Sequence, residues 1–304
     1  MVSLRNRGFI TQLLFVENEH RQFCGHPISQ TNPKQNYPEE LRGRLSVKSG
    51  CLTIVGTGIQ FVGQVTLAAK AWIEQSDKVL YAVADPATAQ WLVSLNPTAE
   101  PLPYNRNNRQ RKETYAQMVE CILAEVNRGL NVCVVFYGHP GVFADSAHQA
   151  IRQARQEGFR AQMLPGISAE DCLFADLSLD PGKRGCQSFE ATDFLIRRRK
   201  FDPTSALILW QIAMVGNRGF YEKGGHVRGL QILTEVLQNY YTFGSEAIVY
   251  EAAVYHPVCE PSIQRMPLEK LPEAKVTESS TLYMPPNPPL AIDMEMVERL
   301  GMHL

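Results

Sequence analysis

The chain has 304 residues, of which 44% are hydrophobic, and this is enough to bury a substantial core and to favour two globular domains over one. Its 30 basic and 31 acidic residues give a formal net charge of -1 at pH 7. Such a balanced charge provides no overall field that would attract nucleic acid or an anionic membrane surface. We therefore expect neither as a partner.

The cysteines and the apolar runs bear on the compartment. Seven cysteines are present, and they form neither a CxxC motif nor a Cys/His cluster at metal-ligand spacing, so we expect reduced thiols and no metal site. The apolar patch at residues 9–16 is interrupted by Thr11 and Gln12 and lacks a following cleavage site. No apolar run approaches the roughly 20 residues that span a bilayer. These features predict a cytoplasmic protein.

The first half of the chain predicts an extension followed by an α/β domain. Residues 1–49 lack sustained periodicity and are expected to form an N-terminal extension of unknown role. From Cys51, short apolar runs alternate with helical stripes, which is typical of βαβ units. The predicted strands are residues 52–55, 79–84, 132–137 and 161–164, and the predicted helices are 67–73, 89–95, one containing Tyr115, and 147–156. We assign residues 50–164 to this domain.

A second α/β domain is predicted at residues 165–286. Ser168 and Asp171, three residues apart, form a helix-start signature that could be ordinary capping. Strands are predicted at 206–212, 247–252 and 281–284, and helices at 230–240 and, in the short tail 287–304, at 294–300. The basic run 197–200 has no interleaved aromatic residues and is assigned no function.

The helix that contains Tyr115 brings a cation and a phenol together. Apolar residues recur at helical spacing from Tyr115 to Val126, and Gly129 is a plausible stop. Arg111 and Tyr115 are four residues apart and therefore share one face in the first turn. Tyr115 could simply be the first core residue, with Arg111 solvated. A guanidinium beside a phenol would also favour the phenolate, which suits removal of a proton from a very weak acid.

Two loops follow predicted strands. Gly56, Thr57 and Gly58 could bring backbone amides against a nucleotide-like ligand, but the spacing to Gly63 is not that of the dinucleotide fingerprint and a tight turn explains it equally well. Residues 137–143 read Tyr-Gly-His-Pro-Gly-Val-Phe and follow a strand at the end where ligands bind in open α/β sheets. The histidine of this segment is either satisfied within the turn or aimed at a small ligand.

Together these motifs resemble the tetrapyrrole methylase superfamily of S-adenosylmethionine enzymes and, more narrowly, its borosin branch of peptide backbone α-N-methyltransferases. The similarity covers about residues 50–286. It is carried by Gly56-Thr57-Gly58, Asp85-Pro86, residues 111–118, 137–143 and 164–177, and Trp210-Gln211. The resemblance implies a two-domain α/β fold with the S-adenosylmethionine site in the cleft between the domains.

The resemblance also implies roles for particular residues. The methyl donor is expected to touch Tyr137, His139, Val142, Ala169, Gln211, Ala252 and Thr281. Arg111 and Tyr115 align with the family's catalytic pair. Tyr104 is the nearest match to a further catalytic tyrosine, in a loop that is shorter here than in the family pattern.

The chemistry of a peptide amide supports these roles. Its nitrogen is a poor nucleophile because the lone pair is delocalised into the carbonyl, so its proton must be removed. That proton is far less acidic than a phenol, whose pKa is about 10, so the site must stabilise the negative charge that develops. We expect Tyr115, with its phenolate favoured by Arg111, to take the proton directly or through water. Tyr104 or Arg111 would hold the carbonyl oxygen.

The resemblance also concerns the substrate. In the family's founding type the substrate is the enzyme's own C-terminal tail, reached across a dimer in which each chain clasps the other. Here 18 residues follow Pro286. We therefore expect a split form that acts on a separate precursor protein with a binding domain and a C-terminal core, and a homodimer that forms a heterotetramer with that precursor.

Two alternatives stay open. The first is a small-molecule methylase of the same superfamily that acts on a tetrapyrrole-like ring. The region 105–111 offers three arginines and no other obvious cluster exists, fewer than such an anionic substrate suggests. The second is a non-catalytic relative that binds peptides, although retention of Arg111 and Tyr115 speaks against it.

Overall fold

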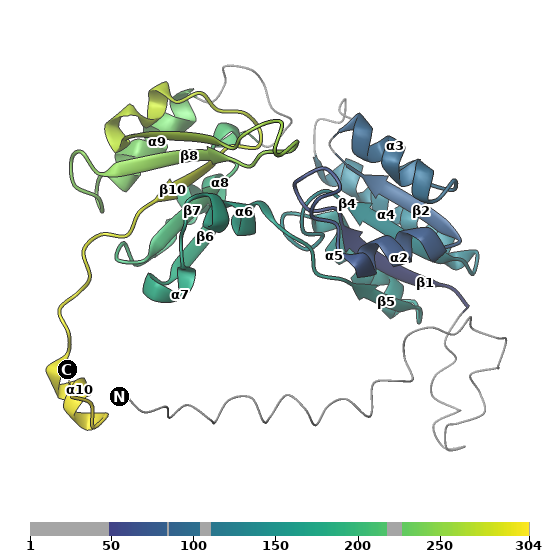
Figure 1. Ribbon diagram of the computed structural model, residues 1–304, viewed down its shortest axis with the longest axis horizontal. Coiled ribbons are helices and arrows are strands. Elements are labelled where there is room, and N and C mark those ends of the chain that lie inside the picture. Colours follow the sequence, from purple (N-terminus) through teal and green to yellow (C-terminus); the bar gives the residue numbers. More distant parts are fainter. Residues whose placement is uncertain (1–48, 84, 104–110, 218–226, 304) are drawn as a thin grey trace, which may run out of the picture. The chain divides into compact units, whose positions relative to one another are not determined.

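The computed structural model describes residues 49–83, 85–103, 111–217 and 227–303. They contain two five-stranded sheets with helices packed on them (Figure 1). This confirms the predicted α/β fold class. The predicted extension, except for Ser49, and Tyr104 lie outside the described residues.

The first sheet is entirely parallel and has the strand order β3-β2-β4-β1-β5. Its strands are β1 (Cys51–Gly56), β2 (Lys78–Ala82), β3 (Glu100–Pro101), β4 (Asn131–Phe136) and β5 (Arg160–Met163). The intervening helices are α2 (Leu67–Gln75), α3 (Pro86–Leu95), α4 (Arg111–Asn127) and α5 (Asp145–Gln156). The predicted βαβ alternation is confirmed, with boundaries shifted by up to three residues.

Both faces of this sheet are buried because alternate strand residues pack on different helices. Leu52 and Ile54 of β1 belong to one core cluster with residues of α4 and α5. Val55 packs in another cluster with Ile73 of α2 and Leu92 of α3. Burial on both faces explains why these strands are almost continuously apolar in the sequence.

Local capping sets the starts of two helices. α3 begins at Pro86, three residues before the predicted start, because Asp85 Oδ1 accepts a hydrogen bond from the Thr88 amide at 2.9 Å. In α6 (Ala169–Asp176), Ser168 and Asp171 form the reciprocal capping box that their spacing predicts. Capping thus fixes the chain where it leaves β2 and where it follows β5.

The second sheet is mixed and has the order β6-β7-β10-β8-β9, with only β6 and β7 parallel. Its strands are β6 (Cys186–Glu190), β7 (Ala206–Trp210), β8 (Glu246–Glu251), β9 (Ser262–Pro267) and β10 (Thr281–Met284). The remaining helices are α7 (Pro181–Arg184), α8 (Ala191–Ile196), α9 (Val227–Leu237) and α10 (Met294–Arg299), with the 3-10 turns η2 (Ile212–Met214) and η3 (Leu268–Glu273).

This sheet also has two buried faces. Leu207 and Leu209 of β7 pack with Leu230 of α9. Ile208, between them in sequence, packs with Leu173 of α6 on the other face. β9 and α8 were not predicted, because β9 is mostly exposed and lacks an apolar run and α8 is only six residues long.

The exits of β1 and β4 meet in a contact that only glycine permits. Gly58 N donates to Gly138 O at 3.3 Å, and Gly138 N donates to Gly58 O at 2.9 Å. A Cβ added to Gly56 would lie 2.1 Å from Gly138 O. The two motifs at residues 56–58 and 137–143, which are separate in the sequence, are therefore in direct contact in the fold.

The substitution Gly56→Ala should lower the free energy of unfolding by about 3 kcal/mol, because the methyl group would push the two strand exits apart. Urea denaturation measures this. Gly63→Ala is the matched control: its Cβ would meet nothing closer than Gln60 Oε1 at 3.5 Å. Similar unfolding midpoints for the two variants would contradict the proposed tight contact.

Candidate functional site

A cavity of about 410 Å³ lies at the C-terminal ends of β1, β2 and β4 and beside the ends of β7 and β8 and the start of β10. Ligands bind outside the carboxyl ends of strands in α/β sheets, so this is the expected location. Its lining comes from Ile59, Ala82, Tyr115, Met118, residues 136–139, 142–146, 168–169, 210–211, 251–252, Val254, 278–279 and Thr281.

The cavity brings together most of the residues that the sequence singles out. Tyr115 lines it, together with the seven residues expected to touch a donor: Tyr137, His139, Val142, Ala169, Gln211, Ala252 and Thr281. Arg111 is the first residue of α4, one turn before Tyr115, and its side chain lies outside the described part. Tyr104 is likewise undescribed. Residues from six distant segments therefore share one cavity.

His139 is held by its own turn. Its Nδ1 accepts a hydrogen bond from the Gly141 amide at 2.9 Å, and Gly141 O lies 2.9 Å from Nε2 of His148. With Nδ1 as acceptor, a neutral imidazole carries its proton on Nε2. His139 is therefore satisfied within the turn and also lines the cavity, so the two interpretations from the sequence are compatible.

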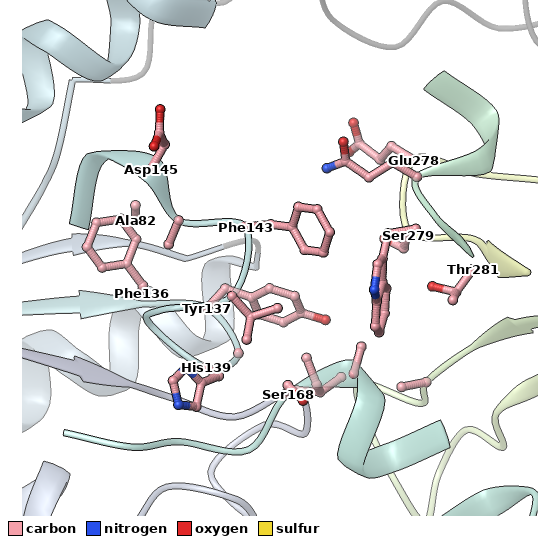
Figure 2. Close-up of a pocket in the computed structure, with 18 of the residues that line it drawn as sticks. Ala82, Phe136, Tyr137, His139, Phe143, Asp145, Ser168, Glu278, Ser279 and Thr281 are labelled. Carbon is pink, nitrogen blue, oxygen red and sulfur yellow. The ribbon is translucent and has the colours of Figure 1, made fainter. Parts of the chain in front are cut away.

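Aromatic side chains project into the cavity from the β4–α5 segment. Figure 2 shows Tyr137 and Phe143 extending toward the side that carries Ser279 and Thr281. The Phe143 ring lies 5.7 Å from that of Trp210 and is 50% exposed. Phe143 has a φ of 53° and Gln211 a φ of 58°, in the left-handed region that non-glycine residues rarely adopt. Such strain is typical of ligand sites.

Tyr137 is unsuited to act as a base. Desolvation, with smaller effects from Cys172 and Asp85, raises the pKa of its phenol to about 12. Tyr137 therefore stays protonated near neutral pH and keeps its hydroxyl as a hydrogen-bond donor. This leaves Tyr115 as the other tyrosine on the described lining.

The glycine-rich loop after β1 is a tight turn. Thr57 N donates to Phe136 O at 2.9 Å, and Ile59 N donates to Gln64 Oε1 at 2.8 Å. These amides are used within the protein, and the Gly58 amide binds Gly138 O. A cradle of backbone amides for a nucleotide is therefore not formed by this loop.

A further contact lies beside Val254, which lines the cavity. Tyr255 Oη donates to Asp85 Oδ1 at 3.1 Å, which joins the segment after β8 to the start of α3. Phe61 N donates to Val254 O at 2.8 Å, and the rings of Phe61 and Tyr255 lie 6.1 Å apart. This contact was not predicted, because its members are distant in the chain.

Three carboxylates on the lining were not predicted as site residues: Asp145, Glu251 and Glu278. Glu251 is the last residue of β8, so the tendency of ligands to bind at strand ends could have identified it. Lysine and arginine are absent from the described lining. Among the described residues, no group of three or more His, Cys, Asp or Glu could hold a metal ion. None of their helices is long and apolar enough to cross a membrane.

Comparison with known proteins gives a family match and close relatives. Residues 51–255 match the family described as Tetrapyrrole (Corrin/Porphyrin) Methylases. The methyltransferase/ribosomally synthesized cyclic peptide omphalotin A precursor of Omphalotus olearius is 42% identical over 83% of this chain and 62% of its own length. A methyltransferase/ribosomally synthesized type I borosin cyclic peptide precursor of Mycena rosella is 40% identical over 84% of this chain and 65% of its own length. The chain thus spans less than two thirds of these relatives.

Two solved structures share the fold. The methyltransferase CobJ has a TM-score of 0.59 and 18% identity over 78% of this chain and 95% of that one. Uroporphyrin-III-C-methyltransferase from Thermus thermophilus has a TM-score of 0.56 and 17% identity over 78% of this chain and 92% of that one. At such low identity the likeness shows the fold alone.

Two substitutions separate the structural and binding contributions of His139. His139→Ala should lower the free energy of unfolding by about 1 kcal/mol, because the Gly141 amide loses its acceptor. His139→Asn should keep most of this stability, since its amide oxygen can accept the bond, but should weaken S-adenosylmethionine binding. Chemical denaturation and titration calorimetry measure the two effects. If His139→Asn bound S-adenosylmethionine as tightly as the wild-type protein, the role of His139 would be limited to stabilising its turn.

Proposed function

Because the chain belongs to the tetrapyrrole methylase family, we propose that it transfers methyl groups from S-adenosylmethionine to backbone amide nitrogens of a peptide. Enzymes of this family use S-adenosylmethionine as methyl donor. One observation carries the proposal: Tyr115 lines the same cavity as all seven residues expected to touch the donor. The methyl donor and the candidate base would then share one cavity.

The described lining suits the donor. A volume of about 410 Å³ lies within the usual range for small-molecule sites. The partly exposed side chains of Tyr137, Val142 and Phe143 offer apolar surface to a flat adenine ring, while burial of the phenol end of Tyr137 desolvates its hydroxyl. The carboxylates suit a cationic sulfonium, and no lysine or arginine of the described lining opposes it. We assign donor binding to Tyr137, His139, Val142, Ala169, Gln211, Ala252 and Thr281.

The peptide acceptor is supported by the relatives. Two proteins that are 42% and 40% identical to this chain over most of its length are named as methyltransferases joined to cyclic peptide precursors. A cyclic peptide precursor is the common element of those names, and we propose a peptide as the substrate of this chain. We include in the proposal a separate precursor protein, with a binding domain and a C-terminal core, as the source of the peptide.

Bound S-adenosylmethionine supplies an electrophilic methyl group. The side chains must remove the amide proton and stabilise the charge left on the amide. Tyr115 is half-buried at the edge of the core that covers α4, and it is the proposed base. Arg111, one helical turn away, favours the phenolate, and Arg111 or Tyr104 holds the carbonyl oxygen. Tyr137 stays protonated and orients a ligand by donating a hydrogen bond.

The charge of the described lining disfavours the small-molecule alternative. Tetrapyrroles with several carboxylates require cationic partners, because burial of unpaired negative charge is costly. The described lining has three carboxylates and no lysine or arginine. Incubation with uroporphyrinogen should therefore give no methylated ring, whereas apolar peptides should gain methyl groups.

Removal of the proposed base tests the mechanism. Tyr115→Phe should reduce peptide methylation by at least about a hundredfold, the usual lower range for general base catalysis, while S-adenosylmethionine still binds. Tandem mass spectrometry of the precursor after co-expression measures both the extent of methylation and its position on backbone nitrogens. Tyr240→Phe, which changes an exposed tyrosine outside the cavity lining, is the control.

The outcomes separate the alternatives. Undiminished methylation by Tyr115→Phe would exclude it as base. If the wild-type protein bound the donor but methylated no peptide, the chain would be a peptide-binding relative without catalysis. Methyl groups on side chains would refute the proposed acceptor.

We also include a homodimer, which would form a heterotetramer with two precursor chains. Light scattering coupled to gel filtration should then give twice the chain mass of 34.1 kDa for the protein alone. A single-chain mass at micromolar concentration would contradict this arrangement.

A further inference from the structure

The three carboxylates of the lining have no cationic partner among the described residues. Asp145, Glu251 and Glu278 form none of the ion pairs found there, whereas Asp193 outside the cavity pairs with Arg197 and Arg199. In a partly enclosed cavity, charges are screened less than at an open surface. The described lining therefore presents three carboxylates, and no described lysine or arginine, to a ligand.

Glu251 is the carboxylate most firmly held. It is half-buried at the end of β8, and its Oε1 accepts hydrogen bonds from Thr277 Oγ1 at 2.9 Å and from Ser280 Oγ. Ser280 is fully buried, and its Oγ also accepts a bond from Thr277 N at 2.7 Å. Glu278, in the same turn, is exposed. Both bonds to Glu251 end on Oε1.

We propose that Glu251 is a specificity-determining residue that makes the cavity prefer the cationic methyl donor over its neutral demethylated product. This inference rests on the proposed function. The donor and the product share the adenosine, the amino group and the carboxylate, and they differ in the charge on sulfur. On transfer, the S–CH₃ bond breaks with its electron pair left on sulfur, an N–CH₃ bond forms, and the amide proton goes to the base. The attraction to Glu251 disappears, so the spent product leaves more easily.

A purely structural role for Glu251 predicts something different. Its bonds to Thr277 and Ser280 also hold the turn before β10, and loss of that turn would weaken both ligands equally. Glu251→Gln removes the charge but keeps an amide oxygen that can accept both bonds. The ratio of the affinities for S-adenosylmethionine and S-adenosylhomocysteine therefore measures the effect of the Glu251 charge alone.

Titration calorimetry with S-adenosylmethionine and with S-adenosylhomocysteine tests the proposal. Glu251→Gln should weaken binding of S-adenosylmethionine about fivefold to tenfold, as expected for partly screened charges a few ångströms apart. It should weaken binding of S-adenosylhomocysteine by less than about twofold. Glu246→Gln is the control. It lies on the same strand, is exposed, pairs with Arg265 at 3.2 Å and is not part of the lining. It should change neither affinity.

A second measurement uses only the wild-type protein. Its preference for S-adenosylmethionine over S-adenosylhomocysteine should fall as the salt concentration rises, because ions screen the carboxylate. The role of Glu251 would be overturned if the preference of the wild-type protein did not change with salt. It would also be overturned if Glu251→Gln lowered the affinity for both ligands equally or left both affinities unchanged. If the wild-type protein bound neither ligand, the proposed function itself would fail.

Discussion

The ligand end of the first sheet depends on the close approach of two backbone segments at Gly58 and Gly138. Their two reciprocal hydrogen bonds tie the exit of β1 to the exit of β4. Gly56 faces Gly138 O, and a Cβ on Gly166 would lie 3.2 Å from the same oxygen. A side chain at Gly56 would therefore move the start of the segment that carries Tyr137, and with it one wall of the cavity.

The turns around this contact use their backbone amides for hydrogen bonds within the protein. The amides of the glycine turn, such as that of Gly58, donate hydrogen bonds to acceptors within the protein. The amide of Gly141 in the next loop does the same. These amides are therefore not available to a ligand, and the side chains described next are. Segment 137–143 supplies the aromatic surface of Tyr137 and Phe143, and the end of β8 supplies the carboxylate of Glu251. Both sheets therefore contribute side chains to the cavity wall, with Phe143 from the first and Trp210 and Glu251 from the second.

The sequence predicted the elements that have strong local signals. Strands such as β1 and β4 are apolar on both faces, and the Ser168 capping box fixed the start of α6 as expected. The sequence did not predict β9, whose exposed edge carries no apolar run. It also missed the bond between Tyr255 and Asp85, which are 170 residues apart, because such pairings depend on the assembled sheets.

The motifs pointed to residues that line one cavity, whereas the carboxylates of that cavity were not predicted. Motif matches identified Tyr137 and Gln211, which line the cavity, but a carboxylate at the end of a strand resembles any solvated acid until the cavity is known. The fold alone does not settle the substrate, since a structure named as a uroporphyrin methyltransferase shares it at 17% identity. A ring bearing several carboxylates would be repelled by Glu251 and its neighbours, whereas an uncharged peptide backbone would not. Among the described side chains, the carboxylates at the strand ends therefore suit an uncharged acceptor better than an anionic ring.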